Sequence, residues 1–251
     1  MRMIAPAIAP AAAAGELDDL GLARAYAYPR ERWLRANMVA SADGAAYLDG
    51  RSGGLSSSGD RRLFGVLRVL ADVVLVGAGT ARAEKYKPAR RAATLAPLLA
   101  PLREGRPATA AIALVSRALD LDLAAPLFTE APPDARTIVI TCAASPSGAR
   151  AGAARVADVI VAGEKSVDLP AALTVLAGRG LGRVICEGGP RLLGQVAADG
   201  LLDELCLTLS PTLAGPGAGR ILNGPPFTAA PMTLGHLLAE DGFLFCRYTV
   251  P

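Results

Sequence analysis

Short apolar segments that recur along the chain constrain its fold more than any other feature. The clearest is Val73–Gly77, whose sequence VVLVG offers apolar atoms to both faces of a sheet, as in a central parallel strand covered by helices on each side. Four more segments have the same character, at residues 110–115, 137–141, 156–161 and 181–186, with helical patterns such as residues 169–179 between some of them. Strand, helix and strand at this spacing predict a parallel α/β sheet.

A further strand and a helix are expected earlier in the chain. Residues 35–40 (RANMVA) predict a short strand that ends in the turn-like sequence of residues 41–44. Ser58-Gly59-Asp60 then supplies N-cap chemistry, and residues 63–71 repeat apolar side chains at helical spacing.

The last third of the chain changes character. Residues 205–210 and 242–249 are apolar or alternating, with no long amphipathic helix between them, which predicts edge or antiparallel strands that close the sheet. Residues 83–107 are rich in Ala, Pro and basic side chains, so a long surface loop or an irregular excursion is expected there rather than a linker between domains.

A length of 251 residues permits one large α/β domain or at most two small ones. We expect a single domain over residues 26–251, preceded by a disordered or loosely packed arm over residues 1–25, because Pro6 and Pro10 interrupt an Ala-rich opening that is too weak for a secretory signal. Asp72 breaks the strongest apolar run, so no membrane span is expected.

Composition excludes several classes of function. The net charge is only +3, from 26 basic and 23 acidic residues interspersed along the chain, and 4% of residues are aromatic, which argues against a nucleic-acid binder. The single histidine, His236, makes zinc sites and Ser/His or Cys/His nucleophiles improbable, so no metal is expected, and His236 itself is expected at the surface or as a cap. Four widely spaced cysteines are interpreted as reduced and structural, and the chain as cytoplasmic.

The strongest local motif is Glu187-Gly188-Gly189-Pro190, which follows an apolar strand and opens a helical pattern. Glycines allow backbone amides to approach a ligand, and a helix N-terminus favours a phosphate, so the motif predicts a pyrophosphate cradle. A tight turn without a ligand is nearly as good an interpretation. Glu187 is expected in the crevice at the strand end, where open α/β sheets bind ligands, although a helix-capping role is an alternative.

A second glycine motif, Gly77-Ala78-Gly79-Thr80, also follows a strand. It lacks the third glycine of a dinucleotide-binding fingerprint, because Arg82 stands there. Thr80 could donate to a phosphate or cap the next helix. Ser116-Arg117, at another strand end, is the best candidate for binding a 2′-phosphate and thus for a preference for NADPH over NADH.

Polar side chains near the first strand and helix form a third group: Asn37, Asp43 and Asp60, with Ser52 and Arg68 nearby in sequence. Amides and carboxylates can bind the edge of a pyrimidine or pterin ring, and an arginine can bind a phosphate or carboxylate. Asp43 and Asp60 would equally serve a turn and an N-cap. A basic group after Thr80 could steer a phosphorylated substrate or simply be solvated; it comprises Arg82, Lys85, Lys87, Arg90 and Arg91.

Taken in order, these motifs resemble the reductase domain of riboflavin biosynthesis from about Trp33 to the C-terminus. The ordered set is Asn37-x-x-x-Ser41-x-Asp43-Gly44, Gly77-x-Gly79-Thr80, Glu187-Gly188-Gly189-Pro190-x-Leu192-Leu193-Gly194, and Leu202-Asp203-Glu204-Leu205 with Pro211 and Gly215. The resemblance implies a dihydrofolate reductase-like fold, a three-layer αβα arrangement with a mostly parallel central sheet and antiparallel edge strands. It also implies NADPH as cofactor and a homodimer.

Site residues follow from the same resemblance, position by position. Ser52, Arg68 and Glu187 would contact the substrate, together with Asn37 from the residue-based interpretation. The resemblance implies cofactor contacts at Gly54, Thr80, Glu84, Ser116, Gly189, Pro190, Arg191, Leu192 and Leu193. The residue-based interpretation adds Arg117 and Gly188. The candidate catalytic residues, which would hold the heterocycle during the reaction, are Asp43, Asp60 and Glu187.

Two departures from the family pattern stand out. Bifunctional members carry a zinc deaminase with an HxE and paired-cysteine signature, and this sequence has no ligands for it, which predicts a stand-alone reductase. Where the family usually shows Asp-Asp-Pro followed by a basic position, this sequence has Ala83-Glu84-Lys85-Tyr86-Lys87-Pro88. That region is expected to help hold a phosphoribosyl group.

The expected function is an NADPH-dependent reductase that reduces the ribose imine of a 5-amino-6-(5-phosphoribosylamino)uracil-type substrate to a ribityl chain. Hydride transfer is the cofactor's chemistry, and the protein supplies placement. One alternative is a dihydrofolate or pterin reductase on the same scaffold, with Asp60 on the amino-imine edge of the pterin. Another is an NADPH-binding protein without catalysis.

Overall fold

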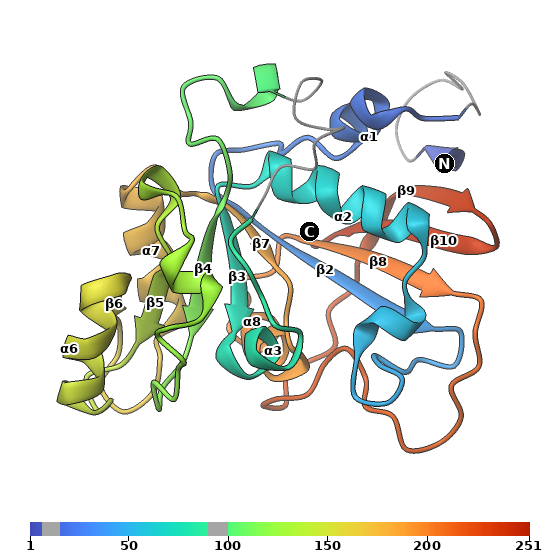
Figure 1. Ribbon diagram of the computed structural model, residues 1–251. Coiled ribbons are helices and arrows are strands. Elements are labelled where there is room, and N and C mark those ends of the chain that lie inside the picture. The colour runs from blue at the N-terminus through green and yellow to red at the C-terminus, as the bar shows by residue number, and fades with distance from the viewer. Residues whose placement is uncertain (7–15, 90–99) are drawn as a thin grey trace.

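The computed structural model describes residues 1–6, 16–89 and 100–251, which form one ten-stranded sheet in the order β1-β9-β10-β8-β2-β7-β3-β4-β5-β6 (Figure 1). The strands are β1 (Arg2–Pro6), β2 (Trp33–Ser41), β3 (Val73–Gly77), β4 (Ala111–Val115), β5 (Ile138–Thr141), β6 (Asp158–Val161), β7 (Arg183–Cys186), β8 (Glu204–Ser210), β9 (Thr233–Glu240) and β10 (Phe243–Thr249). Every strand expected from the sequence is present, within two residues of its predicted bounds. β1 and β9 were not predicted.

The sheet has a parallel part and an antiparallel edge. The strands from β8 through β2, β7, β3, β4 and β5 to β6 all pair in parallel, whereas β10, β9 and β1 pair antiparallel. The mostly parallel sheet with antiparallel edge strands is therefore confirmed. β8 and β10, expected as edge or antiparallel strands, pair antiparallel with each other, and β8 lies inside the sheet between β2 and β10.

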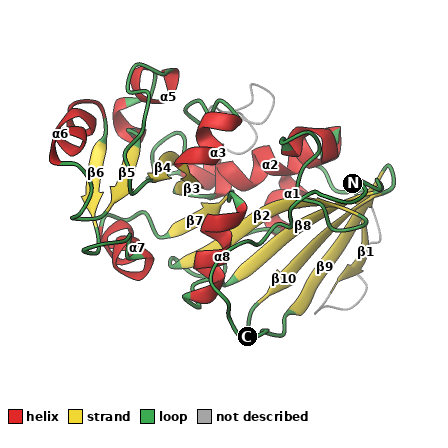
Figure 2. Cartoon of the chain, turned by 90° about the horizontal axis from the view of Figure 1, so that it is seen from below, coloured by secondary structure: helices red, strands yellow, loops and turns green. Residues whose placement is uncertain are grey.

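Helices cover both faces of the sheet, so the three-layer αβα arrangement is confirmed (Figure 2). Side chains of α1, α2, α3 and α5 join the apolar cluster on one face, and those of α7 and α8 join the cluster on the other. The helices are α1 (Asp19–Ala25), α2 (Ser58–Leu70), α3 (Ala78–Ala83), α5 (Pro126–Thr129), α6 (Ser147–Val156), α7 (Leu169–Gly178) and α8 (Pro190–Ala198), with short 3-10 helices η1 (Ser52–Leu55), η2 (Ala100–Arg103) and η3 (Pro133–Ala135).

β3 shows why the apolar runs predicted the fold. Val74 and Val76 pack in the cluster under α2, and Val73 and Leu75 pack in the cluster under α8. Successive side chains of a strand point to opposite faces, so only a strand covered on both sides needs an unbroken apolar sequence.

Residues 1–6 and 16–25, within the arm that the sequence predicted as disordered or loosely packed, are part of the fold. β1 pairs with β9, and α1 is capped by Asp18, whose carboxylate accepts the backbone N–H of Gly21. Leu22 and Ala23 of α1 are fully buried against the core. The Ala/Pro-rich composition belongs mainly to residues 7–15, which lie outside the described residues.

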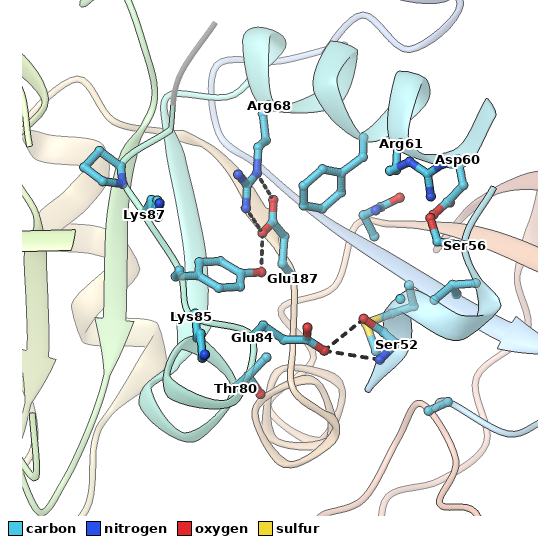
Figure 3. A pocket seen from close by; sticks show the side chains of 18 residues that line it. Ser52, Ser56, Asp60, Arg61, Arg68, Thr80, Glu84, Lys85, Lys87 and Glu187 are labelled. Atoms are coloured by element: carbon cyan, nitrogen blue, oxygen red, sulfur yellow. Dashed lines mark hydrogen bonds and ion pairs between the residues drawn. The ribbon is translucent and has the colours of Figure 1, made fainter. Parts of the chain in front are cut away.

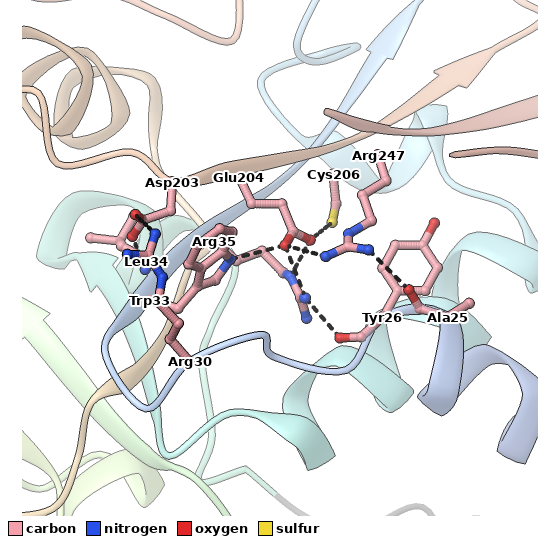
Figure 4. A network of polar contacts seen from close by, with 10 residues as sticks. All are labelled: Ala25, Tyr26, Arg30, Trp33, Leu34, Arg35, Asp203, Glu204, Cys206 and Arg247. Atoms are coloured by element: carbon pink, nitrogen blue, oxygen red, sulfur yellow. Dashed lines mark hydrogen bonds and ion pairs between the residues drawn. The ribbon is translucent and has the colours of Figure 1, made fainter. Parts of the chain in front are cut away.

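A buried polar network ties α1 to the antiparallel part of the sheet (Figure 4). Glu204 of β8 accepts from Arg35 of β2 at 2.6 Å and from Arg247 of β10 at 3.0 Å. The same guanidinium groups donate to Tyr26 and Ala25, the carbonyls at the end of α1. The two arginines outweigh the effect of burial and lower the pKa of Glu204 to about 2.

His236 of β9 is buried next to this network, so the prediction that it lies at the surface was wrong. Its ring meets Tyr26 edge-to-face, with the ring centroids 4.5 Å apart. Burial, with Arg247 close by, lowers the pKa of His236 to about 4. The imidazole is therefore a neutral core group. The four cysteines are free and buried, as predicted.

The segment after α3 is more than a surface loop. Arg103 at the end of η2 is buried and donates to the carbonyls of Val69 and Ala71, where α2 ends. Arg106 pairs with Asp72 at 2.8 Å. Both arginines thus satisfy polar groups at the end of α2, where a helix leaves carbonyls unbonded. Within the described part of the chain, no helix is long and apolar enough to span a lipid bilayer.

Candidate active site

A cleft of about 590 Å³ lies at the carboxyl ends of β2, β7 and β3, beneath α2 (Figure 3). Open α/β sheets bind ligands at this edge. The side chains and backbone that line the cleft come from β2, η1, α2, the segment after β3 and the end of β7: Asn37, Met38, Val39, Ala46, Ser52, Gly53, Ser56, Asp60, Arg61, Phe64, Arg68, Thr80, Glu84, Lys85, Tyr86, Lys87, Pro88 and Glu187.

Glu187 lies at the centre of the cleft and is held by three hydrogen bonds. Arg68 of α2 donates to both carboxylate oxygens, from Nε at 2.7 Å and from Nη2 at 2.6 Å. The hydroxyl of Tyr86 donates to Oε2 at 2.6 Å. The Arg68 guanidinium also stacks between two rings, with Cζ 4.2 Å from the centre of Phe64 and 5.3 Å from that of Tyr86. This geometry holds a negative and a positive group rigidly against one wall.

The pairing also fixes the protonation states of the partners. The nearby Glu187 carboxylate raises the pKa of Arg68 despite its burial. Burial and the same carboxylate raise the pKa of Tyr86 well above its usual value. Tyr86 therefore remains a hydrogen-bond donor across the neutral range.

Ser52 and Glu84 lie together at the opposite end of the cleft. The backbone N–H and the hydroxyl of Ser52 both donate to one oxygen of Glu84, at 3.2 and 3.1 Å. The contact joins η1 to the end of α3. In this arrangement Glu84 orders the loop that carries Ser52.

Asp60 lines the cleft and is not the N-cap residue of α2. Ser57 is the N-cap of α2, because its hydroxyl accepts the backbone N–H of Asp60 at 3.0 Å. The carboxylate of Asp60 accepts from Thr208 of β8 at 2.6 Å and from Ser56 at 2.7 Å. The N-cap interpretation of Asp60 was wrong, and the carboxylate faces the cleft instead.

The two glycine motifs meet below the cleft. The N–H of Gly77 donates to the carbonyl of Gly188 at 2.8 Å, so the ends of β3 and β7 are joined directly. Gly188 has φ +79°, a conformation that favours glycine, and a Cβ on Gly189 would lie 2.4 Å from the Thr80 hydroxyl. The backbone of this turn is therefore accessible only because both residues lack side chains.

α8 starts at this turn with Pro190 in its first turn, which places free backbone N–H groups of the helix N-terminus beside the cleft. Leu192 and Leu193 are buried in the core under α8, and Arg191 is exposed. The two leucines were expected to contact a cofactor. Their side chains point into the core, so only their backbone atoms could contact a cofactor.

Other predicted site residues lie outside the lining of this cleft. Gly54 is exposed on η1 next to Leu48. Ser116 follows β4, where its hydroxyl accepts the N–H of Leu119 at 3.0 Å, and Arg117 is exposed. β4 pairs in parallel with β3, so Ser116 and Arg117 lie at the carboxyl ends of the strands, as the cleft does, one strand beyond β3.

Asp43 connects two loops rather than facing the cleft. Its carboxylate accepts from Ser41 and from the backbone N–H groups of Ala214 and Gly215, at 3.1 and 2.9 Å for the latter two. These hydrogen bonds lower the pKa of Asp43 to about 2. The geometry fits the turn-forming alternative that the sequence left open and gives Asp43 no contact with the groups in the cleft.

Sequence reasoning missed Tyr86 and Phe64. Phe64 stands four residues before Arg68 on α2, a helical spacing that places both on one face. Tyr86 lies in the segment that departs from the family pattern, and this departure was the available signal. Arg61, Lys85 and Lys87 are exposed at the cleft, while Arg90 and Arg91 lie outside the described residues.

Known proteins resemble the chain over most of its length. The model of the family described as the RibD C-terminal domain matches residues 32–240. The 2,5-diamino-6-ribosylamino-4(3H)-pyrimidinone 5′-phosphate reductase of Archaeoglobus fulgidus is 28% identical over 184 residues, 73% of this chain and 82% of that protein. The reductase of the same name from Methanothermobacter thermautotrophicus is 33% identical over 89 residues, 36% of this chain and 41% of that protein.

Solved structures agree with these relatives. A pyrimidine reductase-like protein from Corynebacterium diphtheriae superposes with a TM-score of 0.77 and 29% identity, covering 88% of this chain and 92% of that chain. RibD from Acinetobacter baumannii has the same fold, with a TM-score of 0.71 and 19% identity over 88% of this chain and 58% of that chain. The resemblance drawn from the ordered motifs is thus confirmed: the chain belongs to the RibD C-terminal domain family and is an oxidoreductase.

Proposed function

We propose that the protein is an NADPH-dependent reductase of an aminopyrimidine ribosylamine 5′-phosphate, whose ribose imine it reduces to a ribityl chain. The names of its relatives support the substrate class. The observation that carries the proposal is an arrangement at one edge of the sheet: a cleft with a polar wall for a heterocycle and exposed cations, and next to it a glycine turn at a helix N-terminus.

The polar wall suits an aminopyrimidine ring. Asp60 and Glu187 offer carboxylate oxygens to ring N–H and amino groups, and Asn37 offers an amide that both donates and accepts. Arg68 and Tyr86 hold Glu187 in place before the ligand arrives. Such preorganisation orients one face of the ring, which is the protein's share of the catalysis.

The exposed cations suit the phosphate of the substrate. Arg61, Lys85 and Lys87 stand along the cleft, and no ion-pair partner for either lysine is found among residues 1–6, 16–89 and 100–251. A phosphate attracts such groups through charge and charge-assisted hydrogen bonds.

The glycine turn fits the pyrophosphate of a dinucleotide. Backbone N–H groups at the start of α8 and the Thr80 hydroxyl border a space that a Cβ on Gly189 would fill. Ser116 and Arg117, one strand further along the same edge, would bind the 2′-phosphate that distinguishes NADPH. When bound, the cofactor supplies the hydride that the imine carbon receives. The chain binds and orients, and the imine is protonated from solvent.

A panel of substrates tests the proposal. The purified protein is mixed with NADPH and either the ribosylaminopyrimidine phosphate or dihydrofolate, and loss of reduced nicotinamide is followed by absorbance. Turnover of the pyrimidine alone is expected. Turnover of dihydrofolate alone would establish the pterin alternative, and NADPH binding without oxidation of either mixture would establish a non-catalytic protein. Sedimentation of the same sample tests the homodimer that the family resemblance implies.

A further inference from the structure

Tyr86 separates the cleft from a second cavity. This side cavity, of about 340 Å³, lies between α3, the end of β4 and the segment that leads into α5. Its lining is mainly apolar, with charged groups at the rim: Ala78, Ala81, Arg82, Lys85, Tyr86, Lys87, Leu114, Asp120, Leu121, Asp122, Ala125, Pro126, Leu127 and Phe128. Lys85, Tyr86 and Lys87 line both spaces, and Tyr86 is the one aromatic side chain that they share.

The side cavity is on the α2 face of the sheet, away from the glycine turn. Leu114, Leu127 and Phe128 belong to the apolar cluster under α2. Leu192 and Leu193 of α8 belong to the cluster on the opposite face. Tyr86 thus stands between the side cavity and the substrate end of the cleft, and Ala78 and Leu114 place the other end of the side cavity beside the ends of β3 and β4.

Two parts of Tyr86 do different things. Its hydroxyl donates to Glu187 at 2.6 Å, and its ring lies 5.3 Å from the guanidinium of Arg68. Loss of the hydroxyl would leave one oxygen of a carboxylate with a single partner, and loss of the ring would join the two cavities. A substitution that removes one part and keeps the other can separate the two effects.

We propose that Tyr86 determines substrate specificity in this reductase: its ring excludes substrates with a bulky apolar group, and its hydroxyl positions Glu187. The inference rests on the proposed function of the cleft. An apolar substituent on the substrate ring would bury itself among Ala81, Leu114 and Phe128 if Tyr86 did not stand in the way. Burial of apolar atoms there would stabilise a complex that the wild-type protein excludes.

Two substitutions test the two parts. Tyr86→Phe keeps the ring and removes the hydroxyl. We expect kcat/KM for the normal pyrimidine to fall about tenfold, mainly because KM rises, since one hydrogen bond to a charged group is lost. Tyr86→Leu shortens the wall. We expect it to bind a pyrimidine with a benzyl group on its 5-amino nitrogen at least about tenfold more tightly than the wild type does, from burial of the added ring.

Calorimetric titration with the normal and benzylated pyrimidines measures binding without turnover, so it separates this proposal from the proposed reaction. Leu121→Ala is the control, because it enlarges the side cavity and leaves the wall in place. We expect it to exclude the benzylated ligand, as the wild type does.

Equal affinities for that ligand in the wild type and in folded Tyr86→Leu would overturn the role of the ring, with Tyr86→Val as the second variant if Tyr86→Leu does not fold. Unchanged KM and kcat in Tyr86→Phe would overturn the role of the hydroxyl. If all variants bind the pyrimidines but reduce none of them, the proposed reaction is wrong. The role of Tyr86 in specificity is then decided by the binding affinities alone.

Discussion

Arg68 and Glu187 are 119 residues apart in sequence and form a two-point ion pair at the centre of the cleft, with N–O distances of 2.7 and 2.6 Å. Two parallel N–H···O bonds fix the plane of the carboxylate as well as its position, which a lysine cannot do. The side chain of Glu187 is only 2% exposed, and its position depends on this partner.

Replacement of the arginine tests that dependence. We expect Arg68→Lys to lower kcat/KM about 100-fold, because a shift of about 1 Å in a positioning group has that effect, although the charge is kept. Steady-state kinetics measure it, and Arg32→Ala, at an exposed arginine before β2, is the control. A lysine variant with wild-type kinetics would show that charge alone is required.

The space at Gly189 gives a second prediction. A Cβ there would lie 2.4 Å from the Thr80 hydroxyl, so Gly189→Ala is expected to lower stability by about 1–3 kcal/mol through overpacking and to raise KM for NADPH. Thermal unfolding and kinetics measure the two effects. Gly148→Ala, on α6 where a Cβ meets nothing within 4 Å, should not lower stability and should leave KM for NADPH unchanged. If Thr80→Ala does not restore the stability of Gly189→Ala, the clash is not the cause.

Cofactor preference gives a third prediction. Arg117→Ala is expected to weaken NADPH binding about tenfold, because one charge-assisted hydrogen bond is lost, and to leave NADH binding unchanged. Fluorescence titration with both dinucleotides measures this. Arg179→Ala, an exposed arginine just before the start of β7 and thus at the opposite edge of the sheet, serves as the control. Equal affinities of the wild-type protein for NADPH and NADH would rule out the proposed preference.

The buried His236 predicts how stability depends on pH. Its pKa in the folded protein is about 4, below the ordinary 6.5, because burial and Arg247 disfavour the charged ring. The unfolded chain therefore binds the proton first as pH falls, and stability is lost between pH 6.5 and 4, by on the order of 3 kcal/mol. Denaturant unfolding of the wild type and of His236→Gln measures the difference.

The window above pH 4.5 isolates this effect. Glu204, whose pKa is lowered to about 2 from 4.5, contributes stability that is lost only at lower pH. His236→Gln should therefore show a weaker loss between pH 6.5 and 4.5. The same slope in both proteins would mean that His236 titrates normally when folded.

The parallel core could be predicted from sequence because burial on both faces demands unbroken apolar runs, as in β3. α6 could not, because its Ala-rich sequence buries only Ala153 and leaves no apolar stripe. β1 is held by pairing with β9, more than 200 residues away, and no local pattern encodes such a partner. His236 was misplaced for the same reason: its contacts with Tyr26 and Arg247 come from parts of the chain that no local pattern around His236 indicates.

The site divides in a similar way. The glycine turns and Glu187 could be found because each follows a strand, and carboxyl ends of parallel strands converge at one edge. The partners of each group could not be found. Asp43 and Asp60 had the same sequence signature, a carboxylate near a turn, yet one joins two loops and the other faces the cleft.

The most direct test of the proposed reaction is to follow where the hydride of NADPH goes. The protein is incubated with the ribosylaminopyrimidine phosphate and NADPH deuterated at nicotinamide C4, and the product is examined by mass spectrometry and NMR. The proposed reaction predicts one deuterium at the first carbon of a new ribityl chain. Oxidation of NADPH with no deuterium in the pyrimidine product, or deuterium found only in a reduced pterin, would contradict it.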